Sequence, residues 1–272
     1  MNLFFRRLQY EWASWLAVAF IALLPFGRLA EIPLSIFAIS LAFLARSAEN
    51  RARLRSVAGF VVPLFLCYWL PMLLSTFDSF DPQKSWVQSI AALRYLAAAL
   101  ALAILLQPAS ARERVLRWTA WLLLFWAIDA FIQLFAGRDL FGIAMHPDRL
   151  NALFVKKYQF FGPTLAMLSP LVLEHARRQW RPWAWAVSFA LILGAVMIAG
   201  MRAGWLTMGL VLLTYMALML KRENRELRQT MLTIPVLAVI VLAVAYFSSP
   251  LFQQRIDVTR ALTSGDEITL DA

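Results

Sequence analysis

One arginine stands where its charge could take part in chemistry. Arg202 lies between two glycines in the segment 199–205, which separates two long apolar stretches. An arginine in hydrocarbon costs about 2.5–3.5 kcal/mol or more, unless it is paired or reaches water. Its planar donors match two phosphate oxygens, and the glycines let the backbone approach a neighbour closely. Arg202 is therefore a candidate for phosphate binding, and the other interpretation is an interfacial arginine that only ends a helix.

A second group of basic residues lies in the segment 137–158. Its members are Arg138, Arg149, Lys156 and Lys157. Together they could form a cationic surface for an anionic substrate, or they could be solvated charges that offset the two aspartates of the segment. We favour substrate binding for Arg149 and Lys157, and the solvated role for Arg138 and Lys156.

Other residues give weaker signals. His146 could act as a general base, but a lone histidine that precedes a proline is more often structural, and we expect the structural role. Arg255 follows the last apolar stretch and is a further candidate for substrate binding. A metal site is not expected, because two histidines and the single cysteine, Cys67, cannot form a ligand cluster.

Arg94 and Asp129 are charged residues well inside apolar stretches. Each lies about seven residues from the predicted external end of its helix, so at 1.5 Å per residue they share a depth of about 10 Å. Unpaired charges at that depth are costly. We predict that the two form a buried ion pair, with the polar wall of a substrate cavity as the alternative.

The elements that position these residues are predicted to be membrane helices. Hydrophobic residues make up 61% of the 272 residues and charged residues 15%, against roughly 45–50% and 25% in a soluble domain. The composition predicts an all-α integral membrane protein, since a soluble fold of this size cannot bury so much apolar surface. We expect about nine spans, at 12–26, 32–45, 57–75, 87–107, 118–136, 159–175, 183–200, 204–220 and 230–247.

The distribution of positive charge predicts the topology. Sixteen of the 26 Lys and Arg residues lie in five alternate connecting segments, which the positive-inside rule places in the cytoplasm. These segments are 1–11, 46–56, 108–117, 176–182 and 221–229. The N-terminus is then cytoplasmic, the C-terminus external, and 137–158 an external loop. The net charge of +10 follows the same pattern, so we expect no nucleic-acid partner.

Two features leave the architecture open. The short second stretch could form a shallow hairpin with the first, which would preserve the topology of all later segments. The segment 248–272 ends without a closing element and resembles the start of a larger external loop. We therefore expect the chain to continue beyond Ala272.

Three segments resemble the bacterial O-antigen ligases and the related O-antigen polymerases. Residues 200–205 are similar to the Ser-Arg-Gly turn of that family, with Met201 and Ala203 in place of its small residues. Residues 137–142, 149–154 and 161–163 resemble its external loop and the helix that follows. Residues 254–256 resemble the start of its large periplasmic loop. The resemblance covers roughly residues 110–272.

The resemblance implies a glycosyltransferase of the bacterial inner membrane that is active at the periplasmic face. It would move a glycan from undecaprenyl pyrophosphate to lipid A–core in lipopolysaccharide biosynthesis, without metal or cofactor. Arg202 maps onto an arginine that holds the pyrophosphate. The second arginine and the histidine general base of the family would lie beyond Ala272.

Other functions remain open at this point. An O-antigen polymerase or a protein O-oligosaccharyltransferase of the same superfamily would share the donor and differ in the acceptor. A transporter or flippase for an anionic lipid would need charges throughout the bilayer depth, whereas the candidates here gather at the external side. A structural membrane subunit would leave Arg202 unexplained.

Overall fold

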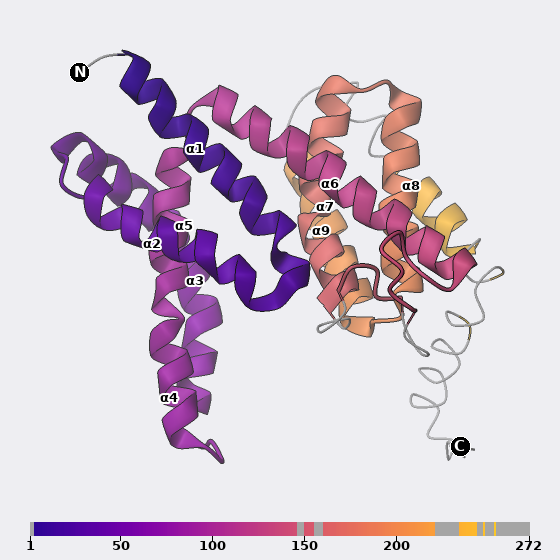
Figure 1. Ribbon diagram of the computed structural model, residues 1–272, viewed down its shortest axis with the longest axis horizontal. Coiled ribbons are helices and arrows are strands. Elements are labelled where there is room, and N and C mark those ends of the chain that lie inside the picture. The colour runs from indigo at the N-terminus through magenta and orange to yellow at the C-terminus, as the bar shows by residue number, and fades with distance from the viewer. Residues whose placement is uncertain are drawn as a thin grey trace. The chain divides into compact units, whose positions relative to one another are not determined.

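The computed structural model describes residues 3–145, 150–154, 160–220, 234–243, 247 and 253, with the side chains of 3–10 and 220 excepted. Within these residues the chain is all-helical, and one isolated bridge between Arg138 and Ala144 is its sole β feature. The chain divides into two compact units, Met1–Val115 and Leu116–Ala272, here called unit 1 and unit 2. Figure 1 shows the helices and their labels.

Unit 1 contains five α-helices, one 3-10 helix and the first residues of a further helix. They are α1 (Leu3–Ala22), η1 (Leu24–Ala30), α2 (Glu31–Leu44), α3 (Ala48–Ser75), α4 (Pro82–Ala91), α5 (Leu93–Leu105) and the start of α6 (Ala109–Ala136). The break between α1 and α2 occurs where Gly27 adopts a φ of 67° that L side chains rarely take. Asp81 begins α4 by accepting a hydrogen bond from the Lys84 N–H at 3.1 Å, with Pro82 at the first helical position.

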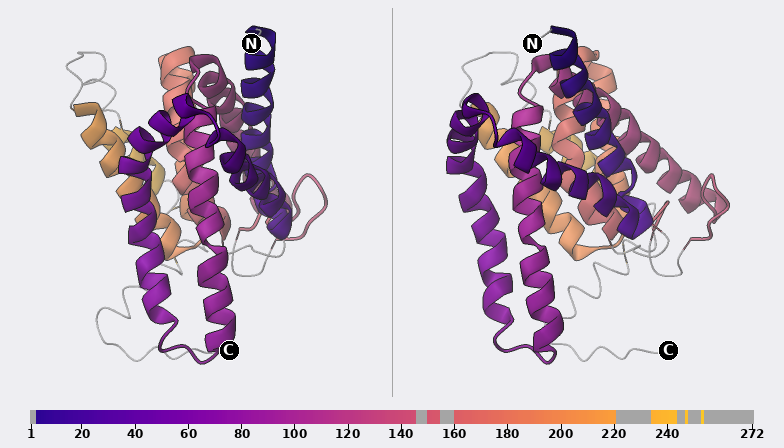
Figure 2. Two further views of the ribbon diagram at one scale, coloured as in Figure 1. Left: turned by 90° about the vertical axis from the view of Figure 1, so that its left-hand side faces the viewer. Right: turned by 60° about the vertical axis from the view of Figure 1, so that its left-hand side comes forward.

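A long hairpin forms part of unit 1. Figure 2 shows α3 as one arm, and α4 with α5 as the other. The indole N–H of Trp69 donates a hydrogen bond of 2.8 Å to the Ser89 carbonyl, which links the two arms. No residue of α3 is buried within the part of the chain that the structure describes, although α3 is 28 residues long and strongly apolar. Such a surface fits hydrocarbon and would be costly in water.

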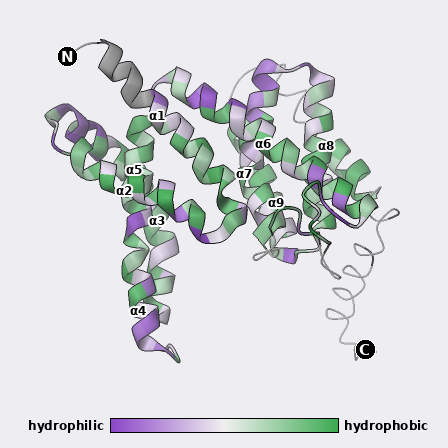
Figure 3. Cartoon of the chain, in the orientation of Figure 1, coloured by the Kyte–Doolittle hydropathy of each residue, from purple (hydrophilic) through white to green (hydrophobic). Residues whose placement is uncertain are grey.

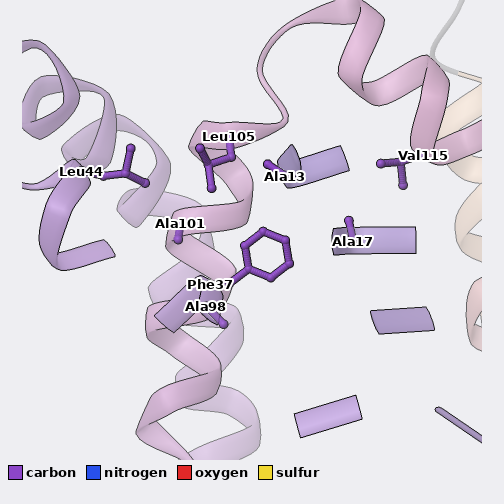
Figure 4. Close-up of a cluster of buried hydrophobic side chains, with 8 residues drawn as sticks. All are labelled: Ala13, Ala17, Phe37, Leu44, Ala98, Ala101, Leu105 and Val115. Carbon is purple, nitrogen blue, oxygen red and sulfur yellow. The ribbon is translucent and has the colours of Figure 1, made fainter. Parts of the chain in front are cut away.

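The core of unit 1 is built largely from alanine. Its buried residues are Ala13 and Ala17 of α1, Phe37 and Leu44 of α2, Ala98, Ala101 and Leu105 of α5, and Val115 of α6 (Figure 4). Small residues let helix axes approach closely, and this drives association where lipid removes the hydrophobic gain between helices. Arg114 ties α6 to α1 through a 2.9 Å hydrogen bond to the Ser14 hydroxyl.

Unit 2 contains the rest of α6 and three further long helices. They are α7 (Phe161–Gln179), α8 (Pro182–Ile198) and α9 (Arg202–Leu220). Residues Ile234–Ala243 form a shorter apolar helix. The second half of α8 is buried without interruption from Ile192 to Ile198, and α7 packs against both α8 and α9.

The helices α7 and α9 run parallel, side by side. A Cβ built on Gly204 would lie 3.2 Å from the backbone carbon of Gly162. Further along, the Ser169 hydroxyl contacts the Met208 sulfur at 3.8 Å, and the Tyr215 hydroxyl lies 3.5 Å from Glu174. The contacts follow the same order in both helices, so their N-termini lie at one end of unit 2.

The described helices have the length and character of membrane helices. Five are long and apolar enough to cross a membrane: Leu24–Leu44, Ala48–Ser75, Pro82–Leu105, Ala109–Ala136 and Arg202–Met219. Apolar residues cover the helices, and hydrophilic residues gather near their ends (Figure 3). The fold class is thus that of a helical membrane protein. Each predicted span overlaps a helix of the structure, while the count of nine and the sidedness of the termini stay predictions.

The contact between α7 and α9 makes a prediction about two glycines of one helix. Gly204→Ala should lower the apparent Tm in detergent, because the new Cβ meets backbone atoms of Gly162 and Pro163 at 3.2 and 3.3 Å. Gly209→Ala is the matched control, since a Cβ there has nothing within 4 Å. It should be neutral or stabilising by up to about 1 kcal/mol, because alanine has the higher helix propensity. Equal Tm shifts for the two variants would contradict the packing.

Candidate functional site

Arg202 is the first residue of α9. The turn before it, 199–201, is closed by Gly200, whose φ of 71° only glycine adopts without strain. The indole N–H of Trp205 donates a 3.0 Å hydrogen bond to the Met197 carbonyl and so holds the start of α9 against the end of α8. The Arg202 side chain is exposed. A rigid backbone therefore presents a guanidinium that points away from the packed core.

The start of α7 lies against this turn. A Cβ on Gly162 would lie 3.1 Å from the Ala199 Cβ, just before the turn. A Cβ on Gly204, just after the turn, would lie 3.2 Å from the backbone carbon of Gly162. Only glycine at both positions allows the two backbones to approach so closely. The start of α7 and the start of α9 are thus locked together at one end of unit 2.

Two buried polar side chains lie at the end of α6 in the same unit. Asp129 and Gln133 are separated by one helical turn, so they share one face of the helix, and neither is exposed to any extent. The Asp129 carboxylate accepts a 2.9 Å hydrogen bond from the Leu140 N–H. The Gln133 amide N–H donates to the Ile143 carbonyl at 3.3 Å. Both side chains therefore hold the first part of the segment that follows α6.

This first part, residues 137–145, is a tight hairpin. Asp139 organises it, because one carboxylate oxygen accepts hydrogen bonds from the N–H groups of Phe141 and Ile143 at 2.9 and 2.7 Å. The Met145 N–H closes the hairpin on the Gly137 carbonyl at 3.0 Å. Leu140 and Phe141 at its tip are 55% and 63% exposed. The hairpin therefore has an exposed apolar tip, while polar hydrogen bonds hold its backbone.

The second part, residues 150–154, returns to the same glutamine. The Gln133 carbonyl oxygen accepts hydrogen bonds from the N–H groups of Asn151 and Ala152 at 3.2 and 2.8 Å. Ala152 has a φ of 43°, in the left-handed region, which is unfavourable for alanine. Its hydrogen bond to Gln133 helps to hold the backbone in this conformation. All five residues of this part are buried. One side chain therefore satisfies backbone groups on both sides of 146–149.

Aromatic contacts join this segment to the helices. The Phe154 ring packs edge-on against Trp126 of α6, with centroids 5.4 Å apart, and lies 5.7 Å from the Phe161 ring at the start of α7. Such pairs contribute about 0.5–1.5 kcal/mol beyond their area burial. The end of α6, the segments 137–145 and 150–154, and the starts of α7 and α9 therefore form one connected site, here called the α6–α9 end of unit 2.

The other end of unit 2 has a different character. There, Glu174 accepts hydrogen bonds from Arg177 at 2.9 and 3.0 Å and also pairs with Arg178. It lies roughly 20 Å along α7 from Gly162, at 1.5 Å per residue. The hydrogen bond to the Glu174 carboxylate also raises the pKa of the Arg177 guanidinium. These positive charges are neutralised in part, unlike those of the α6–α9 end.

Two exposed arginines of the α6–α9 end carry no such counter-charge. Within the residues that the structure describes, neither Arg202 nor Arg138 has an ion-pair or hydrogen-bonding partner for its guanidinium. Arg138 was expected to be a solvated loop residue. Its side chain is exposed, and its backbone forms the isolated antiparallel β-bridge with Ala144. Both guanidiniums are free to bind an anion.

Each residue of the predicted ion pair has a partner within its own unit. Arg94 lies in unit 1, where it pairs with Glu31 at 3.2 Å and stacks on the ring of Tyr95 at 5.3 Å. Asp129 lies in unit 2 and binds the Leu140 backbone instead. Glu31 begins α2, which packs extensively against α5, and the sequence spacing did not indicate this neighbour. The pairing of Arg94 with Asp129 across the two units stays a prediction.

Four predicted site residues, His146, Arg149, Lys157 and Arg255, lie outside the described residues. The same is true of Lys156 and of nearly all of the predicted tail 248–272. Across the described ranges, no three His, Cys, Asp or Glu side chains gather in a way that could hold a metal ion.

Gln133 is a residue of the candidate site that the sequence analysis missed. It is an uncharged residue in an apolar stretch and gave no signal by itself. Its position four residues after Asp129 was the available signal, because polar residues at this spacing share a helix face and so have a common neighbour.

No protein-family model matches the chain, and no curated protein or solved structure shows significant similarity to it. The geometry of the α6–α9 end therefore carries the functional argument.

The geometry, combined with the predicted topology, makes a prediction about sidedness. In a Cys67→Ser background, Arg202→Cys should react with a membrane-impermeant maleimide on intact spheroplasts. Arg181→Cys is the matched control, because Arg181 is an exposed arginine that precedes α8 at the opposite end of unit 2. It should react only after the membrane is permeabilised. Labelling of position 202 only after permeabilisation would contradict the predicted topology.

Proposed function

We propose that the protein is a metal-independent glycosyltransferase of the O-antigen ligase type. It acts in the bacterial inner membrane and transfers a glycan from undecaprenyl pyrophosphate to lipid A–core at the periplasmic face. The observation that carries the proposal is the exposed side chain of Arg202 at the first position of α9, on a backbone that lies against the start of α7. Among the described residues its guanidinium has no ion-pair or hydrogen-bonding partner. An O-antigen polymerase or a protein O-oligosaccharyltransferase would use the same site with another acceptor.

The local electrostatics favour an anion at this place. The N-termini of α7 and α9 lie at the same end of unit 2, and each contributes about half a positive charge from its helix dipole. Neither helix has an acidic residue in its first turn, and no side chain caps α7. An arginine at a helix N-terminus is unfavourable by itself, so Arg202 adds to a positive potential that a phosphate would relieve.

The chemistry needs such a charge. The acceptor hydroxyl oxygen attacks the anomeric carbon of the sugar, and the bond from that carbon to the pyrophosphate oxygen breaks. The electron pair leaves with the pyrophosphate, and a general base takes the hydroxyl proton. A fixed guanidinium beside the leaving oxygen stabilises the developing negative charge without reorganisation. Arg202 is assigned this role, and the general base has no assignment among the described residues.

The charges deeper in the helices argue against lipid translocation. A flippase needs free charges along the path of the headgroup. Arg94 is neutralised by Glu31, and Asp129 binds a backbone N–H. Arg138 and Arg202, which are both exposed, lie instead at the α6–α9 end of unit 2. This distribution favours chemistry at one membrane surface.

Removal of the guanidinium tests the proposal. Arg202→Ala in the complete protein should lower glycan transfer to lipid A–core by about 100- to 1000-fold, as the loss of one oxyanion donor does in other enzymes. The readout is the lipopolysaccharide ladder of cells that depend on the variant, together with the amount of inserted protein. Arg181→Ala is the control and should leave the ladder intact. A normal ladder from Arg202→Ala would overturn the proposal.

A conservative substitution tests whether the planar N–H groups of Arg202 are needed in addition to its charge. Arg202→Lys keeps the charge and loses the planar pair of donors, so it should recover little of the lost activity. The same cells and the same ladder provide the measurement. Full activity in Arg202→Lys would show that a point charge suffices and would contradict two-pronged phosphate binding.

A further inference from the structure

The hairpin 137–145 has the composition of a surface that meets a lipid headgroup. Its exposed apolar tip, Leu140 and Phe141, lies beside the exposed guanidinium of Arg138. Phe141 also contacts Phe125 of α6, with ring centroids 6.3 Å apart. An apolar tip beside a cation matches the boundary between a phosphate and its hydrocarbon chain. A donor that is a diphosphate of a long lipid presents that boundary.

The hairpin depends on two side chains that never reach its surface. Asp129 and Gln133 are fully buried in α6, and their four hydrogen bonds go to backbone groups of 140, 143, 151 and 152. In a site with little water, a backbone group outside a helix needs such a partner. Loss of either side chain would leave buried backbone groups unsatisfied and release the segment.

We propose that Asp129 and Gln133 are positioning residues, which hold the hairpin 137–145 where it binds the lipid-linked diphosphate donor. The inference rests on the proposed function and adds the part of the site that recognises the donor. Neither residue touches the donor. Their effect passes through the backbone of the hairpin, which carries Arg138 and the apolar tip at the same end of unit 2 as Arg202.

The kinetic test uses purified complete protein, an undecaprenyl-pyrophosphate-linked glycan and lipid A–core. Gln133→Leu should raise the KM for the donor at least tenfold and lower kcat much less, since the donor surface is displaced while Arg202 stays in place. Thr119→Val is the matched control, because Thr119 is also fully buried in α6 and its hydroxyl has no hydrogen-bond partner among the described residues. A merely structural role would reduce the amount of folded protein and leave the KM of the remainder unchanged, and that result would overturn the proposal.

The carboxylate of Asp129 allows a rescue test. One of its oxygens accepts the Leu140 N–H, and the other is buried without a hydrogen-bond partner in the described part of the chain. Asp129→Asn removes the charge, keeps the oxygen that accepts the Leu140 N–H and replaces the other oxygen with an NH2 group, so its KM for the glycan donor should stay within about threefold of the wild type. Asp129→Leu removes the acceptor and should behave as Gln133→Leu does. If Asp129→Asn fails as badly as Asp129→Leu, the charge is the essential feature and the positioning role is wrong.

A measurement without turnover separates this proposal from the function itself. A spin label at Leu140→Cys, in a Cys67→Ser background, should be restricted in the wild type and mobile in Gln133→Leu. A label at Leu206→Cys on the exposed face of α9 should not change. If position 140 stays restricted in Gln133→Leu, the hairpin is held by other contacts and the proposal falls. If the label becomes mobile but the wild type transfers no glycan, Gln133 does hold the hairpin. The donor-binding role then fails together with the proposed function.

Discussion

The hydrogen bonds that Gln133 makes to the backbone after α6 are the interaction on which the site depends. Where hydrocarbon excludes water, a chain satisfies its backbone groups within a helix or finds polar side chains that replace them. Gln133 makes such hydrogen bonds to backbone groups on both sides of 146–149. Asp129, one helical turn earlier in α6, accepts a further hydrogen bond from the Leu140 N–H. The chain can therefore leave α6 and form an ordered non-helical segment beside the helix ends. Phe154 then packs that segment against α6 and α7.

A second constraint acts between helices. The start of α9 lies so close to α7 that a Cβ on Gly204 would be 3.2 Å from the backbone carbon of Gly162, and a neighbouring atom would have to move. The two helices run parallel, and their N-termini lie together with a guanidinium on one of them. Packing of small residues thus produces the electrostatic feature on which the proposed function relies. The same residue type builds the core of unit 1, where alanines of α1 and α5 surround Phe37.

The two units place their charges differently. Unit 1 carries a long apolar hairpin, and its deep arginine is matched by Glu31 and by the ring of Tyr95. In unit 2, Glu174 neutralises Arg177 and Arg178 near the end of α7, whereas Arg138 and Arg202 at the other end have no ion-pair partner among the described residues. An arginine without a counter-charge is costly beside apolar surface, so the position of Arg202 directly between two apolar helices calls for a function.

The sequence by itself determined the class of protein and the places of its helices. Apolar runs and their spacing are local properties, and a helix in lipid satisfies its own backbone, so the predicted stretches and the observed helices overlap along the described chain. Arg202 was also found from sequence, because a charged residue between two apolar stretches is conspicuous wherever the helices pack. The tertiary structure alone decided the partners. Arg94 pairs with Glu31, Asp129 binds a backbone group, and Gln133 organises a segment up to 19 residues further along. Such pairings depend on which helix faces meet in space, and hydrophobic periodicity carries no information about that.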